Sequence, residues 1–322
     1  YYTGNLESPD GRRFGFQLTF FRSRIVALNS GDRNMPVRPS PWRTQQLILA
    51  HAAVSDIAGK KHHHAERTAR QALGIAAAEQ NGDSTRVFLK DWRMELSPGE
   101  HRLEAREKEF SIDLVLVPLK PPAMHGEKGY SRKGRKPESA SCYYSFTRLK
   151  ASGRLGSGDR VFQVDGHAWM DHEFSTNPLE PDLVGWDWFG IQLDNDPELM
   201  AFFLRKKEGG VSEASSGSFV GPSGEPVRLK REDMAVETLN HWESDRSGAK
   251  YPSVWRLEIP RLKISLHVES NLADQEMTTP ESTSVTYWEG SVSAAGKIGG
   301  EPVEGFGYVE LTGYDAKFDA PM

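Results

Sequence analysis

The residues with the clearest potential for chemistry form an acidic triplet, Asp171-His172-Glu173, two residues after Trp169. In an extended segment alternate side chains share a face, so Trp169, Asp171 and Glu173 are expected on one face and His172 on the other. A carboxyl beside a large apolar ring is desolvated, which favours its protonated form. Asp171, His172 and Glu173 are therefore candidate catalytic residues, with a buried carboxyl as the acid and the imidazole tuning it. A salt-bridge cluster at a domain junction is the alternative interpretation.

Further acids lie among aromatic residues elsewhere in the chain. Asp187 stands between Trp186 and Trp188 and is either a second acid or a turn residue. Glu289 and Glu310 belong to aromatic strands of the second half, where they line its interior or cap its mouth. Aromatic rings commonly form the core of a barrel, but rings around an acid also suit an apolar ligand or a transient cation.

The sequence lacks the common signatures of metal, cofactor and nucleophile sites. His62-His63-His64 is expected at the start of a helix, where adjacent side chains point about 100° apart and do not converge on one ion. No CxxC or HExxH spacing, Gly-x-Ser-x-Gly elbow or phosphate-binding glycine loop is present. Cys142, the single cysteine, has no evident base beside it. We therefore predict no metal and no cofactor.

Length and charge narrow the class of protein. A chain of 322 residues suits two domains, and its net charge of −5 does not point to nucleic acid. No apolar run approaches the roughly 20 residues of a membrane-spanning helix, so no transmembrane segment is expected. The chain opens at Tyr1 in what reads as the middle of a strand, which suggests an upstream segment, such as a secretion signal.

Short strands separated by turn residues account for most of the chain. One segment, 61–78, departs from this pattern because its alanines, including Ala65, Ala69 and Ala76, follow a helical spacing. With no alternation of strands and helices, the pattern predicts an all-β protein with one inserted helix and closed or nearly closed antiparallel barrels. A barrel of that size can hold one elongated apolar ligand.

The second half of the chain repeats motifs of the first in the same order. The offset between matched positions falls from 186 at Gly4 to 150 at Trp92, so the first half holds about 36 extra residues, which we assign to the helix and its flanks. The predicted domains are 1–177 and 185–322. The matched motifs begin at Tyr2 and Trp188, Phe20 and Phe202, Trp92 and Trp242, Arg102 and Arg256, Ile112 and Ile264, Tyr143 and Tyr287, and Gly166 and Gly305.

At these motifs the chain resembles the AttH-like and hydroxyneurosporene synthase (carotenoid 1,2-hydratase) family of lipocalin-like proteins. The resemblance implies two tandem lipocalin-like (calycin) barrels and extends over nearly the whole chain. The similar stretches are Tyr1–Leu6, Phe14–Arg22, Trp169–Phe174, Gly185–Trp188, Tyr287–Gly290 and Gly305–Tyr314.

The resemblance also implies roles for individual residues. In a hydratase, Asp171 is the proton donor to an alkene, His172 is its orienting neighbour, and Trp169, Trp186 and Trp188 face the cation. An apolar small molecule, a lipid or isoprenoid, is the implied partner. The implied ligand-binding residues are Trp169, Trp186, Asp187, Trp188, Tyr2, Tyr287, Trp288, Glu289 and Tyr308.

Three functions remain open at this point. The first is a carrier that binds a lipid or isoprenoid, to which the family context adds an ABC transporter as partner and the periplasm or cell envelope as location. The second is a cofactor-free hydratase or cyclase acting on an apolar polyene, which requires a buried acid beside tryptophan. The third is an interdomain scaffold with filled barrels.

Overall fold

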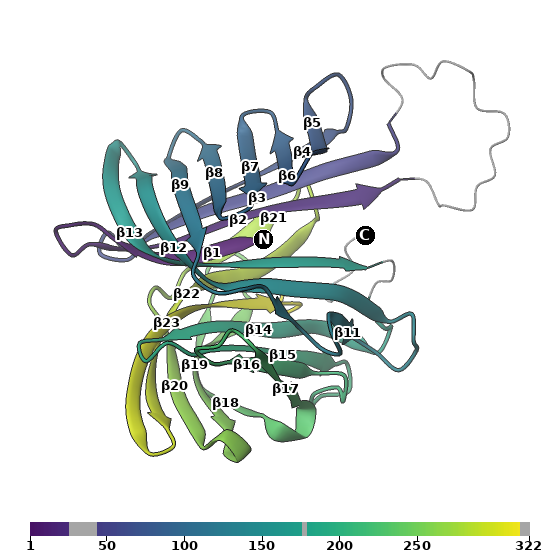
Figure 1. The fold of residues 1–322 in the computed structure, drawn as a ribbon, viewed down its shortest axis with the longest axis vertical. Helices are drawn as coiled ribbons and strands as arrows, with labels where there is room; N and C mark the ends of the chain where they lie inside the picture. The colour runs from purple at the N-terminus through teal and green to yellow at the C-terminus, as the bar shows by residue number, and fades with distance from the viewer. Residues whose placement is uncertain (26–43, 176–178, 316–322) are drawn as a thin grey trace, which may run out of the picture.

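The computed structural model describes residues 1–25, 44–175 and 179–315, and nearly all of them lie in strands and tight turns. The strands form two antiparallel, strongly curled sheets, which are stacked one on the other in Figure 1. The first sheet takes its strands from residues 2–175 and the second from residues 183–312. This all-β, two-barrel architecture is the predicted fold class.

The first sheet has 13 strands in the spatial order β4-β3-β2-β1-β13-β12-β9-β8-β7-β6-β5, and β10 and β11 also pair with β12. Its strands are β1 (Tyr2–Glu7), β2 (Arg13–Arg24), β3 (Gln46–Asp56), β4 (Lys61–Arg70), β5 (Ala76–Asn81), β6 (Ser84–Leu89), β7 (Trp92–Ser97), β8 (Glu100–Arg106), β9 (Phe110–Pro118), β10 (Ala123–Met124), β11 (Tyr130–Arg132), β12 (Ala140–Ser157) and β13 (Arg160–Ser175).

The second sheet has 10 strands in the order β17-β16-β15-β14-β23-β22-β20-β19-β18, with β21 also paired to β22. Its elements are β14 (Leu183–Leu193), β15 (Glu198–Lys206), β16 (Ser216–Val220), β17 (Pro226–Lys230), β18 (Ala235–Glu243), β19 (Lys250–Ile259), β20 (Ile264–Ser270), β21 (Glu276–Thr279), β22 (Val285–Ile298), β23 (Glu301–Thr312) and two single 3-10 turns, η1 (Arg231–Asp233) and η2 (Pro260–Leu262). No helix among the described residues is long and apolar enough to cross a membrane.

The two sheets share one strand order. The series β4-β3-β2-β1-β13-β12-β9-β8-β7 in the first sheet corresponds to β17-β16-β15-β14-β23-β22-β20-β19-β18 in the second, so β1 and β13 correspond to β14 and β23. The pairing corrects one detail of the sequence match. Tyr2 lies opposite Met170 and Phe189 lies opposite Val309, and all four side chains point into their own sheet's core. Phe189, one residue after Trp188, is therefore the counterpart of Tyr2.

The helix predicted over 61–78 is wrong, because this segment forms β4 and β5. A spacing of four residues, as between Ala65 and Ala69, fits a strand as well as a helix, since four is a multiple of the strand period. The neighbouring β3 is buried along most of its length and needs a hydrogen-bonded partner. A ladder from Leu47↔Arg70 to Asp56↔Lys61 supplies that partner and outweighs the helical propensity of alanine.

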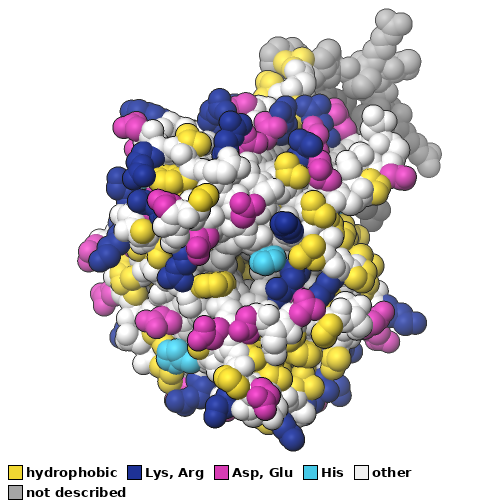
Figure 2. Space-filling view, turned by 60° about the vertical axis from the view of Figure 1, so that its left-hand side comes forward, with side chains coloured by type: hydrophobic (Ala, Val, Ile, Leu, Met, Phe, Trp, Pro, Cys, Tyr) yellow, Lys and Arg dark blue, Asp and Glu magenta, His cyan; other side chains and the backbone are white. Residues whose placement is uncertain are grey.

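Each sheet curls around its own apolar core, and alternation sends every second side chain to the outside. The interiors are filled by side chains such as Leu18 and Trp92 in the first sheet and Phe189 and Trp255 in the second, none of which is exposed. On the face shown in Figure 2, basic and acidic side chains are interspersed over both sheets.

A third apolar cluster lies between the two sheets, where their outer faces meet. We call this interface the seam. It is formed by the outward-facing side chains of β1, β2, β3, β12 and β13 on one side and of β14, β15, β22 and β23 on the other. Strand β1 contacts β23 and β2 contacts β22 across it.

Candidate functional site

Asp171 lies in the seam and accepts hydrogen bonds from three side chains. The Tyr143 hydroxyl donates to Oδ2 at 2.6 Å, the Trp169 indole N–H donates to Oδ1 at 2.6 Å, and the Ser145 hydroxyl also donates to Oδ1. Burial raises the pKa of Asp171 to about 6, and the three donors oppose that shift. Part of the residue's surface remains accessible. Asp171 can therefore exchange a proton near neutral pH.

A second layer of polar groups carries this network into the second sheet. The Trp188 indole N–H donates to the Tyr143 hydroxyl at 3.1 Å. Because Ser145 donates to Asp171, its oxygen accepts from Nε2 of His125 at 2.6 Å, and Nδ1 of His125 then accepts from Ser218 at 2.9 Å. In this arrangement the His125 imidazole carries one proton and is neutral. Its neutral state agrees with its burial, which lowers the pKa of His125 to about 3.

Because His125 is neutral in the folded protein, we expect the free energy of unfolding to depend on pH. The unfolded state takes up a proton near pH 6.5 and the buried ring does not, so stability is lost as pH falls below that value. Between pH 7 and pH 5 the contribution amounts to about 2 kcal/mol. We expect His125→Gln to show a flatter fall in the free energy of unfolding over this range, measured by urea denaturation. His241→Gln, at an exposed position on β18, serves as the control and should follow the parent; a variant slope equal to the parent's would contradict the prediction.

Aromatic rings enclose Asp171 from the side of the second sheet. Trp188 stands edge-on to Trp169 with ring centroids 6.0 Å apart, and edge-on to Tyr1 at 5.6 Å. Met200 and Phe202 of β15 complete this wall and are buried. An acid within an aromatic enclosure is suited to protonating an apolar molecule and to stabilising a positive charge on it.

Two further acids, Glu289 and Glu310, lie directly opposite each other on β22 and β23. Glu289 is 2 % exposed, and burial, followed by the nearby Glu310, raises its pKa well above the usual range. Burial also raises the pKa of Glu310 to about 7, although the Thr312 hydroxyl donates to its Oε1 at 3.1 Å. The Trp186 indole also hydrogen-bonds Glu310. The seam thus contains three carboxyls with raised pKa values.

The alternation of side chains along β13 separates the residues of the predicted triplet Asp171-His172-Glu173. Asp171 and Glu173 share the seam face, but the side chain of Glu173 is 39 % exposed and pairs with Nζ of Lys133 at 2.9 Å. His172 points to the opposite face, where its Nδ1 lies 2.9 Å from the hydroxyl of Tyr144. The structure therefore brings Trp169 and Asp171 together, places Glu173 at the rim, and does not place His172 beside the Asp171 carboxyl.

The predicted ligand-binding residues fall into two groups. Tyr2 lies in the core of the first sheet and contacts His101, and Trp288 lies in the core of the second. Asp187 points away from the seam and pairs with Nε of Arg205 at 3.0 Å. The residues in the seam are Trp169, Trp186, Trp188, Tyr287, Glu289 and Tyr308.

Several seam residues were not selected from the sequence. Ser145 and His125 are short or isolated polar residues whose role depends on contacts with distant strands, so no local signal reveals them. Tyr143 was noted only as a repeat of Tyr287. Gln17 of β2 and Tyr1, just before β1, were not given a role either, although Gln17 is 1 % exposed.

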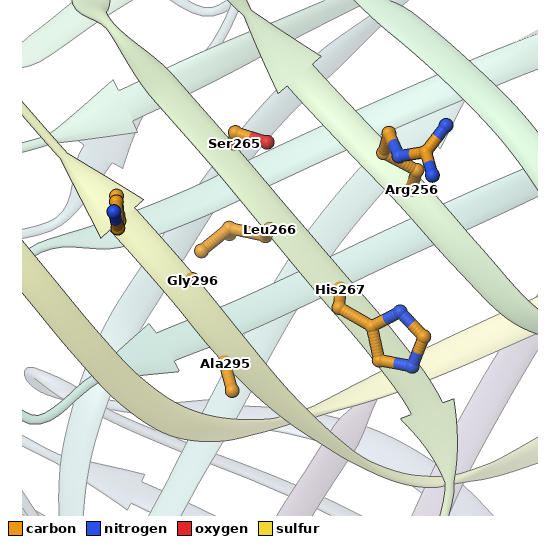
Figure 3. A pocket seen from close by; sticks show the side chains of 7 residues that line it. Arg256, Ser265, Leu266, His267, Ala295 and Gly296 are labelled. Atoms are coloured by element: carbon orange, nitrogen blue, oxygen red, sulfur yellow. The ribbon is translucent and has the colours of Figure 1, made fainter. Parts of the chain in front are cut away.

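Two surface hollows lie apart from these acids. The first, of about 270 Å³, is on the outer side of β19, β20 and β22, where Arg256, His267 and Ala295 surround it (Figure 3). The second, of about 440 Å³, lies between the loop before β12 and the segment that joins the sheets. In the described ranges no three His, Cys, Asp or Glu side chains are grouped as metal ligands; His62–His64 lie on β4.

Comparison with known proteins decides the family. The model of the AttH-like family matches residues 1–314. The chain belongs to the AttH-like family. A crystal structure of an AttH protein from Nitrosomonas europaea shares 32% identity and a TM-score of 0.83, covering 97% of this chain and 91% of that one.

Two other similarities involve proteins named as enzymes. Kievitone hydratase of Nectria haematococca has a TM-score of 0.75 at 14% identity over 98% of this chain and 88% of that one, which shows a shared fold. The dehydratase asqC of Emericella nidulans is 24% identical over 225 residues, or 65% of this chain and 60% of that protein's length. This AttH-like protein thus has hydratase and dehydratase neighbours.

Proposed function

We propose that this AttH-like protein is a hydratase-like enzyme that adds water to, or removes it from, an apolar molecule held in the seam. The observation that carries the proposal is the Asp171 carboxyl, which is enclosed by Trp169, Trp188 and Tyr143 and has a pKa raised to about 6. A group with a pKa near the working pH is an efficient proton donor and acceptor. The neighbouring enzymes named above support the same class of reaction.

The proposed reaction begins at Asp171. Protonated Asp171 donates its proton to one alkene carbon, and the π electrons form the new C–H bond while the other carbon becomes positive. The aromatic enclosure formed by Trp169 and Trp188 stabilises that charge. A water oxygen then bonds to the cation and releases one proton, which leaves the alcohol. Dehydration is the reverse sequence.

A carrier function is the second candidate. The observation that favours it is the apolar cluster of the seam, whose buried Met200, Phe202 and Leu204 make this interface more apolar than proton transfer needs. A carrier would bind an isoprenoid without changing it. The two functions differ in whether the bound molecule acquires oxygen from water.

The test uses two polyenes, squalene and lycopene, incubated with the protein in oxygen-18 water. Mass spectrometry of the extract is expected to show an alcohol that has gained one labelled oxygen, in amounts that increase with protein concentration. Native mass spectrometry of the same mixture reports binding. A bound but unlabelled polyene would favour the carrier, and neither binding nor labelling of these probes would contradict the choice of an apolar polyene.

A further inference from the structure

The internal duplication places two acid-bearing strand pairs on the two sides of the seam. In the first sheet Asp171 of β13 lies directly opposite Ser145 of β12. In the second sheet Glu310 of β23 lies directly opposite Glu289 of β22, at the corresponding positions of the repeat. The duplicated site therefore differs in one respect: the acid of the first sheet faces a hydroxyl donor, and that of the second sheet faces another acid.

Glu289 and Glu310 are close enough to constrain each other's charge. Side chains directly opposite on antiparallel strands have Cβ atoms about 4.5–5.5 Å apart. The charge of Glu310 is accordingly among the causes that raise the pKa of Glu289. Two neighbouring carboxyls in a buried site repel each other when both are charged, so one of them retains its proton. No Lys or Arg side chain is among the main electrostatic influences on either residue. The surrounding ionisable side chains are the phenols of Tyr1, Tyr287 and Tyr308 and the carboxyls of Asp171 and Glu173.

Three buried polar atoms that face the seam make no hydrogen bond that meets the distance and angle criteria among the described residues: Oε1 of Glu289 on β22 and, from the first sheet, the hydroxyl of Tyr1 and Oε1 of Gln17. The Tyr1 side chain is close enough to the Glu289 carboxyl to lower its pKa as a hydrogen-bonding neighbour, so these two polar groups lie side by side. Buried polar groups are nearly always paired in folded proteins. A ligand that carries a hydroxyl or a water molecule beside its reacting carbon would satisfy these atoms.

We propose that Glu289 and Glu310 share one proton and form a second proton-transfer site in the seam. This pair exchanges a proton with the oxygen of the ligand, while Asp171 exchanges a proton with its carbon. This inference rests on the proposed function and extends it by assigning the complementary acid–base group and a polar subsite. The substrate class is accordingly an apolar alcohol or alkene whose reacting oxygen faces the second sheet.

The Glu289–Glu310 pair can accept the proton that the attacking water releases. During hydration, Asp171 gives one proton to carbon, and the attacking water gives one proton to the carboxylate of the Glu289–Glu310 pair as its oxygen bonds to the cation. The pair then holds two protons and Asp171 holds none. Transfer of one proton back to Asp171 through solvent restores the starting state. In dehydration the pair protonates the leaving hydroxyl, and Asp171 removes the proton from carbon.

Infrared spectroscopy of the unliganded protein tests the shared proton without a substrate. At about pH 8 we expect the parent to show the carbonyl stretch of one protonated, buried carboxyl, which shifts on carbon-13 labelling of glutamate and persists in Asp171→Asn. Each substitution removes the charge repulsion but leaves the remaining carboxyl buried, so in Glu310→Gln and in Glu289→Gln the band should disappear at a lower pH than in the parent. It should be unchanged in Glu301→Gln, an exposed position on β23. The parent's label-dependent shift is read without any variant, so a misfolded variant does not prevent the test.

A parent spectrum without a glutamate-dependent band, or a band whose pH dependence neither substitution changes, would overturn the shared proton. The catalytic part is tested separately by the labelled-water assay, in which Glu310→Gln is expected to lower the rate by about 100-fold. An unchanged rate in that variant would overturn the catalytic assignment. If no polyene is hydrated at all but the band is present, the proposed function fails and the proton-sharing pair stands.

Discussion

Asp171→Asn is expected to lower the rate of labelled-water incorporation by about 10²–10⁴-fold, the usual range for loss of a general acid. The amide keeps the shape of the carboxyl but cannot transfer its proton at neutral pH. Its oxygen can still accept from Trp169 or Tyr143, so binding of the polyene should change far less than the rate. The measurement is the initial rate with squalene or lycopene, together with the dissociation constant from native mass spectrometry.

The matched control is Asp165→Asn, because Asp165 is an exposed acid on the same strand. That variant should convert the polyene at the parental rate. If Asp171→Asn retained the parental rate, or lost activity only in proportion to a loss of binding, the role of Asp171 as the proton donor would have to be abandoned.

Glu198→Ala is expected to lower the free energy of unfolding by about 3–5 kcal/mol, the usual cost of removing one partner from a buried ion pair. Glu198 is fully buried and joins the two sheets by accepting from Nζ of Lys120 at 3.0 Å and from Nε of Arg148 at 2.5 Å. The Thr147 hydroxyl also donates to it at 3.1 Å. Without this carboxylate, two poorly solvated cations remain between the sheets.

Urea denaturation provides the measurement, and Asp113→Asn provides the control. Asp113 pairs with Arg154 at the surface, where both side chains are more than 40 % exposed, so its loss should cost less than about 1 kcal/mol. Equal effects of the two substitutions would show that the buried cluster does not hold the sheets together.

The sequence was sufficient for the fold class and for one half of the site. Alternation and the repeated motifs predicted two antiparallel barrels, and alternation placed Trp169 and Asp171 on one face. The predicted helix failed because alanines four residues apart satisfy both periods, and only the long ladder to β3 distinguishes them. The domain limits, 1–177 and 185–322, stay a prediction.

The location of the site could not be predicted, because a strand's sequence does not show which of its faces meets another domain. Strand β14 is buried on both faces over most of its length, so its pattern does not separate Asp187 in the barrel from Trp188 in the seam. The pairing of Glu289 with Glu310 likewise depends on the register of two strands. Both the face that meets the other sheet and the strand register depend on packing between distant segments, which the periodicity of a single strand does not reveal.

The central claim is that the ligand binds in the seam and not inside either barrel. Photo-crosslinking with a diazirine-bearing polyene, followed by peptide mass spectrometry, tests it most directly. We expect label on the peptides that contain Trp169 and Asp171 of β13 and Tyr308 and Glu310 of β23. Label confined to β7 and β8, or to β18 and β19, which lie away from the seam, would contradict the account.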